Sequence, residues 1–357
     1  MPTVTVSCHA SYAFDVGNGI DLEAALRSLG TSAPVPVRSR RRAPQTFEYR
    51  PAPVRVGQEP PNAEIAGLRV ARVEIALFDF GAASVTYTLP FAGELEQLVL
   101  VSAALQDNPV LAHDARTRVA ALLTTLGQAV SRLNLADLIE DYVVFELEPR
   151  PDREPTALAT TYGHLVAQIL RSEVQPLSAE EIADALSHRI AFGTTDITLI
   201  DWNTALLSDP EPDETRTLIE FANVQLLELR HLDAELDRIL DRAYAAMVEA
   251  ERGVLRALRP PVSALRALGA LQIDAATLHE RVTNALKLVG DQFLSRLYSL
   301  ISSRFHVADW DRAITRKLDV LDGVYQKLSD RVTARRVEVL EWIVIVLIAV
   351  EVIAGLR

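Results

Sequence analysis

The sequence is poor in the residues that build covalent and metal-linked frameworks. Its 357 residues include a single cysteine, Cys8, which excludes an intramolecular disulfide and a zinc site made of cysteines. The first residues, MPTVTVSCHASYAF, lack the basic start and the apolar core of a secretory signal. We therefore expect the body of the protein to be made and kept in a reducing compartment.

Positive charge is also scarce. The chain carries 36 lysines and arginines against 48 aspartates and glutamates, a formal net charge of −12. An acidic protein lacks the basic surface that phosphate backbones require, so we expect no DNA partner. The exception is the proline-rich segment 33–42, which ends in the basic run Arg38–Arg42. Two interpretations of this run stay open: contact with RNA, the ribosome or lipid headgroups, and a solvated connector.

The sequence motifs of catalysis are missing as well. There is no G-x-S-x-G or Walker loop, and no cluster of histidine and acidic residues has metal-ligand spacing. Asp79, Phe80 and Gly81 spell the magnesium motif of kinases, but no glycine-rich loop or H-R-D sequence accompanies them. We interpret Asp79 as the end of a strand and expect no enzyme activity, no cofactor and no metal. A site assembled from distant residues would leave no motif.

Strands and helices alternate through residues 1–205, which predicts one α+β or α/β domain. Asp21 is placed to cap its first helix and Ser178 its last. The strands are expected at Thr3–Val16, Leu68–Phe80, Val85–Leu89, Tyr142–Leu147 and, as the final strand, Ile197–Trp202. The helices are expected at Leu22–Leu29, Glu94–Leu105, Pro109–Leu133, Tyr162–Val174 and Ser178–His188.

The composition changes at the acidic, proline-containing stretch Leu207–Glu214, which we interpret as a domain boundary and the start of a helix. Residues 206–338 then show almost continuous helical periodicity, interrupted at Gly253 and at Pro260 and Pro261. This pattern predicts a helical hairpin or coiled-coil stalk.

Residues 339–357 contain the longest apolar run of the chain, VLEWIVIVLIAVEVIAGL, in which only Glu341 and Glu351 are charged. A heptad seam enters this run, and we predict that it mediates membrane or oligomer contacts. Its members are Leu328, Val332, Val339, Trp342, Val346, Ala349 and Ile353.

Three interpretations of the run stay open. As a helix of about 27 Å it approaches the thickness of a bilayer core and would be a C-terminal membrane anchor. Because Arg331, Arg335 and Arg336 precede the run, the body would then lie on the cytoplasmic side. The run could instead be a buried oligomerisation or core helix, in which case the protein is cytoplasmic. The third interpretation is a β-strand, since valine and isoleucine favour strands.

The C-terminal sequence resembles the signature end of the "required for meiotic nuclear division" family, in which a coiled segment leads to L-E-W and a hydrophobic stretch. Here the motif is Leu340, Glu341 and Trp342. The segment VEIALFDFGAASV resembles the family's strand ending, with Phe78, Asp79 and Gly81 at the matching positions. SYAFDVGNGIDLEAALRSL is similar to the family's opening strand, loop and helix.

This resemblance implies a family of unknown biochemical activity, so no catalytic residue is carried over. Its animal relative is a mitochondrial inner-membrane protein that supports mitochondrial translation within a large complex. Fungal relatives are linked to meiotic division. The arginine-rich, lysine-poor body without a transit peptide indicates a bacterial member.

Our leading hypothesis is a non-enzymatic, membrane-anchored, homo-oligomeric scaffold whose helices form a stalk and an assembly surface. Its rival is a soluble enzyme or small-ligand sensor with a pocket in the α/β domain. A deep cleft lined by carboxylates, histidine or arginine would favour this rival. A third hypothesis is a ribosome- or RNA-associated factor that uses Arg38–Arg42.

Overall fold

The computed structural model describes residues 2–30, 51–149, 155–252 and 292–355, together with isolated positions between 269 and 280. The basic run Arg38–Arg42 lies outside these residues. The chain divides into two compact units. The first unit comprises residues 1–231 and 281–308, and the second comprises residues 232–280 and 309–357.

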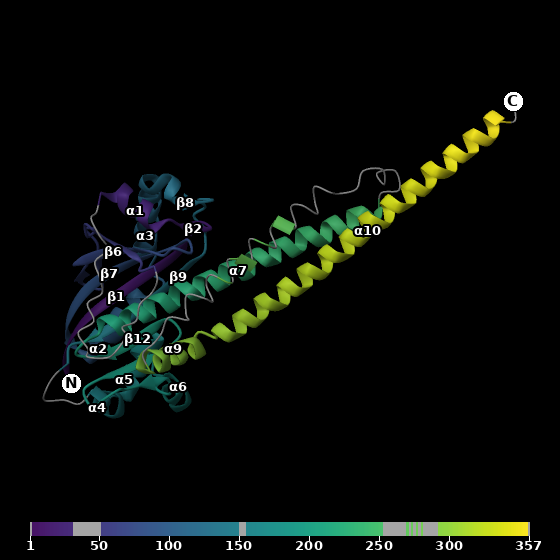
Figure 1. The fold of residues 1–357 in the computed structure, drawn as a ribbon. Helices are drawn as coiled ribbons and strands as arrows, with labels where there is room; N and C mark the ends of the chain where they lie inside the picture. The colour runs from purple at the N-terminus through teal and green to yellow at the C-terminus, as the bar shows by residue number, and fades with distance from the viewer. Residues whose placement is uncertain are drawn as a thin grey trace. The chain divides into compact units, whose positions relative to one another are not determined.

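The first unit is organised around a mixed sheet with the strand order β10-β11-β12-β9-β1-β7-β6-β3 (Figure 1). Neighbouring strands are antiparallel, except that β12 runs parallel to β9. The sheet strands are β1 (Thr3–Asp15), β3 (Val54–Gln58), β6 (Arg72–Leu77), β7 (Ala82–Glu94), β9 (Ile139–Leu147), β10 (Arg189–Ile190), β11 (Ile197–Ile200) and β12 (Thr204–Ser208). Two short antiparallel pairs lie outside this sheet: β2 (Gly19–Ile20) pairs with β8 (Val130–Ser131), and β4 (Glu64–Ile65) pairs with β5 (Leu68–Arg69).

One face of this sheet is apolar. Because side chains alternate along a strand, the even-numbered residues of β1, such as Val6, Cys8 and Tyr12, all enter the same core. Helices supply the other half of that core. They are α1 (Leu22–Leu29), α2 (Leu95–Leu105), α3 (Pro109–Leu126), α4 (Pro155–Thr161) and α5 (Gly163–Arg171), with the short η1 (Gly127–Ala129) after α3.

The opposite face is polar, and the beginning of α7 (Asp213–Arg252) packs against it. At one end, Phe221, Val224 and Leu227 of α7 form a small apolar cluster with Phe78 and Phe80, which follow β6. Elsewhere this face carries the odd-numbered residues of β1 and the polar residues of its neighbours, which makes the boundary between sheet and helix a layer of ion pairs and hydrogen bonds.

The short strands of the sheet are held by buried charge. Asp201, which follows β11, accepts from Arg304 at the end of α9 (Gln292–Arg304) at 2.5 Å and 2.9 Å. The Arg304 guanidinium also stacks over Trp202, 4.9 Å from the ring centre. Because Asp201 and Arg304 are both buried, each needs an opposite charge, and Arg171 Nε, 3.1 Å from the other Asp201 oxygen, adds to this pairing. The short α6 (Ala179–Ala185) adds Asp184 as a further acceptor for Arg304 at 2.9 Å.

The second unit contains the later part of α7 and most of α10 (Val307–Gly355). Lys317 of α10 lies 2.7 Å from Asp233 and 2.6 Å from Asp237, both on α7. Each helix also buries an apolar stripe: Leu236, Ile239 and Ala243 on α7, and Ile314, Leu321 and Val324 on α10.

The predicted mixed N-terminal domain, followed by helices, is confirmed, and several elements match closely. Helix α1 has the predicted bounds, and Asp21 caps it by accepting from the Ala24 amide at 2.9 Å. Other predictions are wrong. Ile197–Trp202 is not the final strand, because β12 follows it, and the predicted strand Leu68–Phe80 is two strands, β5 and β6. The helix predicted to reach Leu133 ends at Leu126, where Gly127 takes a positive φ of 52°.

The C-terminal run is helical, so the β-strand interpretation is wrong. Among the helices in the described ranges, none is both long enough and apolar enough to cross a membrane, contrary to the anchor predicted for residues 339–357. Glu341 and Glu351 interrupt the apolar run at this end of α10, and Glu338 directly precedes it.

The turn between β6 and β7 yields a stability test. Gly81 has a φ of 106°, and a Cβ atom added there would lie 1.8 Å from the carbonyl oxygen of Gly17. We expect Gly81→Ala to lower the free energy of unfolding by more than about 4 kcal/mol, because strain and a backbone clash combine. Gly57→Ala, on β3 of the same sheet with nothing within 4 Å of the added carbon, is the matched control. Equal denaturation midpoints for the two variants would contradict this prediction.

Candidate functional site

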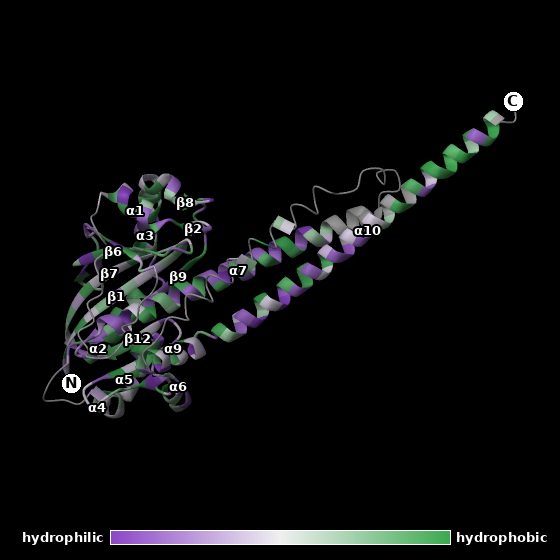
Figure 2. Ribbon diagram, in the orientation of Figure 1, coloured by the Kyte–Doolittle hydropathy of each residue, from purple (hydrophilic) through white to green (hydrophobic). Residues whose placement is uncertain are grey.

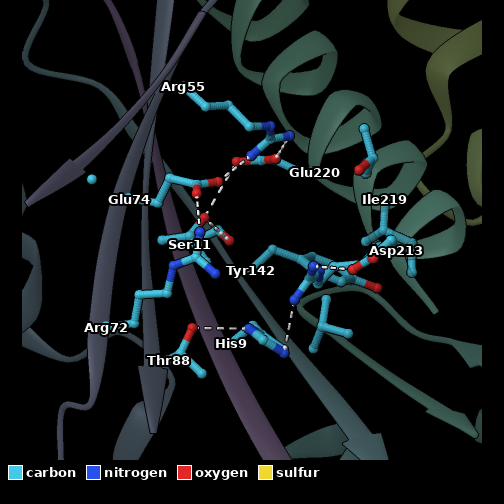
Figure 3. A pocket seen from close by; sticks show the side chains of 15 residues that line it. His9, Ser11, Arg55, Arg72, Glu74, Thr88, Tyr142, Asp213, Ile219 and Glu220 are labelled. Atoms are coloured by element: carbon cyan, nitrogen blue, oxygen red, sulfur yellow. Dashed lines mark hydrogen bonds and ion pairs between the residues drawn. The ribbon is translucent and has the colours of Figure 1, made fainter. Parts of the chain in front are cut away.

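A cavity of about 410 Å³ lies on the polar face of the sheet, where the first turns of α7 cross it (Figure 3). Its walls come from β1, β3, β6, β7, β9 and α7. All of these residues belong to the first unit. The cavity is therefore built by strands that are distant in sequence but adjacent in the sheet.

Strand register explains why hydroxyl and charged side chains gather here. His9 pairs directly with Thr88 across β1 and β7, and Ser11 pairs with Thr86. On the other side of β7, Thr88 faces Arg72 of β6. Directly opposed residues in antiparallel strands place their side chains on the same face, so these pairs form one polar strip along the cavity floor.

Arg55 ties the floor of the cavity to the helix above it. One nitrogen of its guanidinium donates to Glu74 of β6 at 2.8 Å, and another donates to Glu220 of α7 at 2.6 Å. Arg72 donates to the second oxygen of Glu74 at 2.5 Å. Burial works against the charged form of Glu220, but Arg55, together with Ser84 and Arg216, lowers the pKa of this carboxyl. Glu220 is therefore ionised, and it depends on Arg55 for its counter-charge.

His9 sits at the other end of the strip, between a hydroxyl, a carboxylate and a guanidinium. Its Nδ1 lies 3.2 Å from Thr88 Oγ1. Its Nε2 lies 3.2 Å from the Glu146 carboxylate and 3.3 Å from Arg216 Nη1. A neutral imidazole has one donor nitrogen and one acceptor nitrogen, so the carboxylate and the guanidinium compete for Nε2. Burial, assisted by Arg216, lowers the pKa of His9 against the opposing effect of Glu146, which favours the neutral ring.

Charges around the cavity balance. Three arginines and three carboxylates line it, and Arg216 donates to Asp213 at 2.6 Å on the helix side. Apolar surface comes from Val144, Ile219 and the ring of Tyr142. Within the part of the chain that the structure describes, no group of histidine, cysteine, aspartate and glutamate could hold a metal ion. The cavity can therefore offer paired charges, hydroxyls and apolar walls to a small molecule.

A second polar cluster lies deeper under α7. Glu228 is completely buried, and neither of its carboxylate oxygens has a hydrogen-bond partner in the structure. Burial, together with the charge of Asp15, raises the pKa of Glu228 well above its ordinary value. Burial also raises the pKa of Asp15 to about 7, and His231 Nε2 lies 3.7 Å from that carboxyl. These two acids favour protonation in the folded state.

The family-motif residues predicted at the end of the strand form the β6–β7 turn. Phe78 is buried in the apolar cluster under α7, and the Asp79 carbonyl accepts from the Ile20 amide at 2.8 Å. The backbone of Gly81 lies close to the backbone of Gly17. These residues shape a turn, and none of them lines the cavity.

The predicted contact residues at the C-terminus lie far along α10. Trp342, Val346, Ala349 and Ile353 are all exposed, as are Leu340 and Glu341. The side chains of Leu328, Val332 and Val339 lie outside the described residues. Large apolar side chains from Leu340 to Ile353 are each 50–65 % exposed, and Figure 2 shows this end of the helix as almost continuously hydrophobic.

The cavity residues were missed at the sequence level. His9 has Cys8 as its sequence neighbour, but the two side chains point to opposite faces of β1, so the pair carries no joint chemistry. The available signal was the alternation of Ser7, His9 and Ser11 with apolar residues, which marks a strand with one polar face. That signal does not say which strands flank β1 or which helix covers it.

The region of the chain that is similar to known proteins covers most of the sheet. The family model described as "Uncharacterized protein MJ0711, N-terminal domain" matches residues 5–214. The uncharacterized protein MJ0711 of Methanocaldococcus jannaschii is 22 % identical over 229 residues, which cover 64 % of this chain and 69 % of that protein. No solved structure matches.

The buried acids under α7 predict a pH-dependent stability. A carboxyl with a higher pKa in the folded protein binds more protons when folded, so the free energy of unfolding falls as the pH rises from about 4 through about 7. We expect Glu228→Gln to flatten this fall and to be more stable than the parent at pH 8. Urea denaturation at several pH values measures it.

Glu23→Gln, an exposed carboxyl on α1, is the control for this series and should leave the shape of the profile unchanged. A Glu228→Gln profile parallel to that of the parent protein would refute the assignment of the pH dependence to this pair.

The ion pair between Arg55 and Glu220 predicts that the stability of the protein falls when Arg55 alone is replaced. Arg55→Met leaves a buried carboxylate without a counter-charge, and we expect a loss of about 3 kcal/mol in the free energy of unfolding. The double variant Arg55→Met/Glu220→Leu removes both charges and should recover most of that loss. If the double variant is no more stable than the single one, the bridge is not what Arg55 contributes.

Proposed function

The chain belongs to the family of the MJ0711 N-terminal domain, and because the description of that family names no activity, we propose a function from the protein's own surfaces. The protein is a homo-oligomeric assembly protein, in which several copies associate through the apolar end of α10 and each presents its α/β domain. The exposed apolar side chains from Leu340 to Ile353 carry this proposal.

An apolar surface of this kind needs a cover. Soluble monomers seldom expose contiguous apolar patches larger than a few hundred Å². Here Ile343, Val344 and Ile345 are 50–53 % exposed, beside the seam residues Trp342 and Val346 at 62 % and 55 %, so apolar side chains surround the helix instead of forming one stripe. A two-stranded coil buries only one stripe of each helix. Because a bundle of more than two copies covers a wider arc of each helix than a pair does, we infer an assembly of more than two copies.

The sequence pattern favours a second copy of the chain as the partner that covers this apolar surface. Leu321, which is buried within the second unit, occupies the same heptad position as Trp342 and Ala349. The packing pattern thus continues past the part of α10 that is already buried. Glu341 and Glu351 lie off this seam, so identical helices can meet along it without burying a carboxylate. Copies of one helix are self-complementary, which suits a closed symmetric assembly.

The cellular process that such an assembly serves is a further part of the proposal. The resemblance of Leu340, Glu341 and Trp342 to the motif of the "required for meiotic nuclear division" family supports a role in translation. The assembly itself requires no chemistry at the α/β domain.

The proposal is tested by the mass of the assembly in solution. We expect light scattering to give a mass of three or more copies for the full chain and a monomer after deletion of residues 339–357. The assembly should persist at high salt because apolar contacts are not screened. The same mass with and without the deletion would rule the proposal out. So would a full chain that is monomeric in detergent and binds lipid vesicles through this segment.

A matched pair of substitutions separates the seam from general surface effects. Val346 on α10 is 55 % exposed and Val110 on α3 is 56 % exposed. We expect Val346→Asp to reduce the mass of the assembly, whereas Val110→Asp should leave it unchanged.

A further inference from the structure

We propose that the cavity on the polar face of the sheet binds a small, uncharged, polyhydroxylated molecule, held by the paired arginines and carboxylates of β3, β6 and α7 and by the hydroxyls of β1 and β7. This inference is independent of the assembly through α10. It rests on the size of the cavity, the pairing of its charges and its unused hydrogen-bonding groups.

The cavity has the size and lining of a small-molecule site. Its volume of about 410 Å³ falls within the range of ligand pockets, roughly 300–1,000 Å³. The hydroxyl of Tyr142 donates to the carbonyl oxygens of Asp201 at 3.0 Å and Thr204 at 2.7 Å, so the tyrosine contributes its ring to the cavity wall. Val144 and Ile219 add further apolar surface. The C–H faces of a sugar-like ring would find contacts there.

The charges of the cavity are already paired, which selects against a charged ligand. Arg55 bridges Glu74 and Glu220 at 2.8 Å and 2.6 Å, Arg72 holds Glu74 at 2.5 Å, and Arg216 holds Asp213 at 2.6 Å (Figure 3). An incoming anion would lie beside the carboxylate that each arginine already holds, and an incoming cation would lie beside the arginine that each carboxylate already holds. This repulsion between like charges offsets the attraction, so a charged ligand gains little.

A hydroxyl group does not meet this obstacle. A carboxylate has about four lone-pair sites and a guanidinium has five N–H donors, so each can bind a ligand hydroxyl while keeping its partner. Arg72 has the greatest reserve, because its side chain is 70 % exposed and its hydrogen bond to Glu74 uses one nitrogen. Neighbouring hydroxyls on a ligand can match the two-pronged geometry of such groups.

The strand hydroxyls complete the site. Ser11 and Thr86 lie 2.9 Å apart, and Thr86 donates to Glu220 at 3.3 Å, which links the cavity floor to the helix. Thr88 lines the cavity beside His9, and its Oγ1 lies 3.2 Å from His9 Nδ1. A hydroxyl both donates and accepts, so this row can meet ligand hydroxyls in either sense. The favoured neutral state of the His9 ring keeps this end of the cavity free of added charge.

Binding of defined probes to the full-length protein tests the inference. Ligand-observed NMR and calorimetry would compare two neutral polyols, myo-inositol and D-glucose, with inorganic phosphate and glycine. We expect at least one polyol to bind, with an affinity that is the same at low and high salt, and we expect no binding of phosphate or glycine. The result should be the same after deletion of residues 339–357.

Two variants and one matched control locate the binding. Arg72→Gln and Thr88→Val should each weaken polyol binding about tenfold, the effect of losing roughly 1.4 kcal/mol of hydrogen bonding. Arg242→Gln removes an arginine of similar exposure that is paired with Glu235 at 3.1 Å outside the cavity, and it should have no effect. Tighter binding of phosphate or glycine than of either polyol overturns the inference. So does the absence of polyol binding, or polyol binding that neither cavity variant weakens.

Discussion

The first unit depends on the pairing of Arg55 with Glu74 and Glu220. The sheet has one apolar face and one polar face, so each face must pack against helices of a different chemical character. The apolar face is covered by helices that supply leucine and valine, and the hydrophobic effect is the main reason for their position. The polar face needs a helix with matching charges. Helix α7 meets this need with Arg216 and Glu220 over the cavity and with Phe221 and Val224 at the apolar end. Pairing across this boundary must be specific, because each misplaced charge would be buried without a partner.

Buried polar groups seldom raise stability above what apolar packing achieves, so their number under α7 requires another explanation. Glu228 and Asp15 lie in the same layer as Arg55 and His9, and burial raises the pKa values of both acids. A layer of this kind leaves room that apolar side chains would have filled, and the cavity occupies that room. The polar face of the sheet thus combines a cavity with charged and hydroxyl side chains, which are the properties expected of a binding surface.

The features that could be predicted from the sequence are those set by residues close to one another in the chain. Asp21 and Gly30 mark both ends of α1, and both signals lie within the helix's own neighbourhood in sequence. The strand β12 was missed because it is short and buried on both faces, so it shows no alternation, and an acidic stretch next to it suggested a boundary. The cavity could not be predicted, since Arg55, His9 and Glu220 meet only through strand register and the docking of α7. The apolar character of the end of α10 was evident from composition alone, whereas what covers it depends on molecules other than the single chain.

The position of the single thiol has a practical consequence. Cys8 lies in the middle of β1, shows no exposed surface, and burial raises its pKa to about 12. Alkylating reagents attack the thiolate, so they can modify this residue only when β1 separates from the helices that cover it. The natural protein therefore carries its own reporter of core opening. The rate of its modification, with and without a bound small molecule, would give the free energy of that opening without any engineered label.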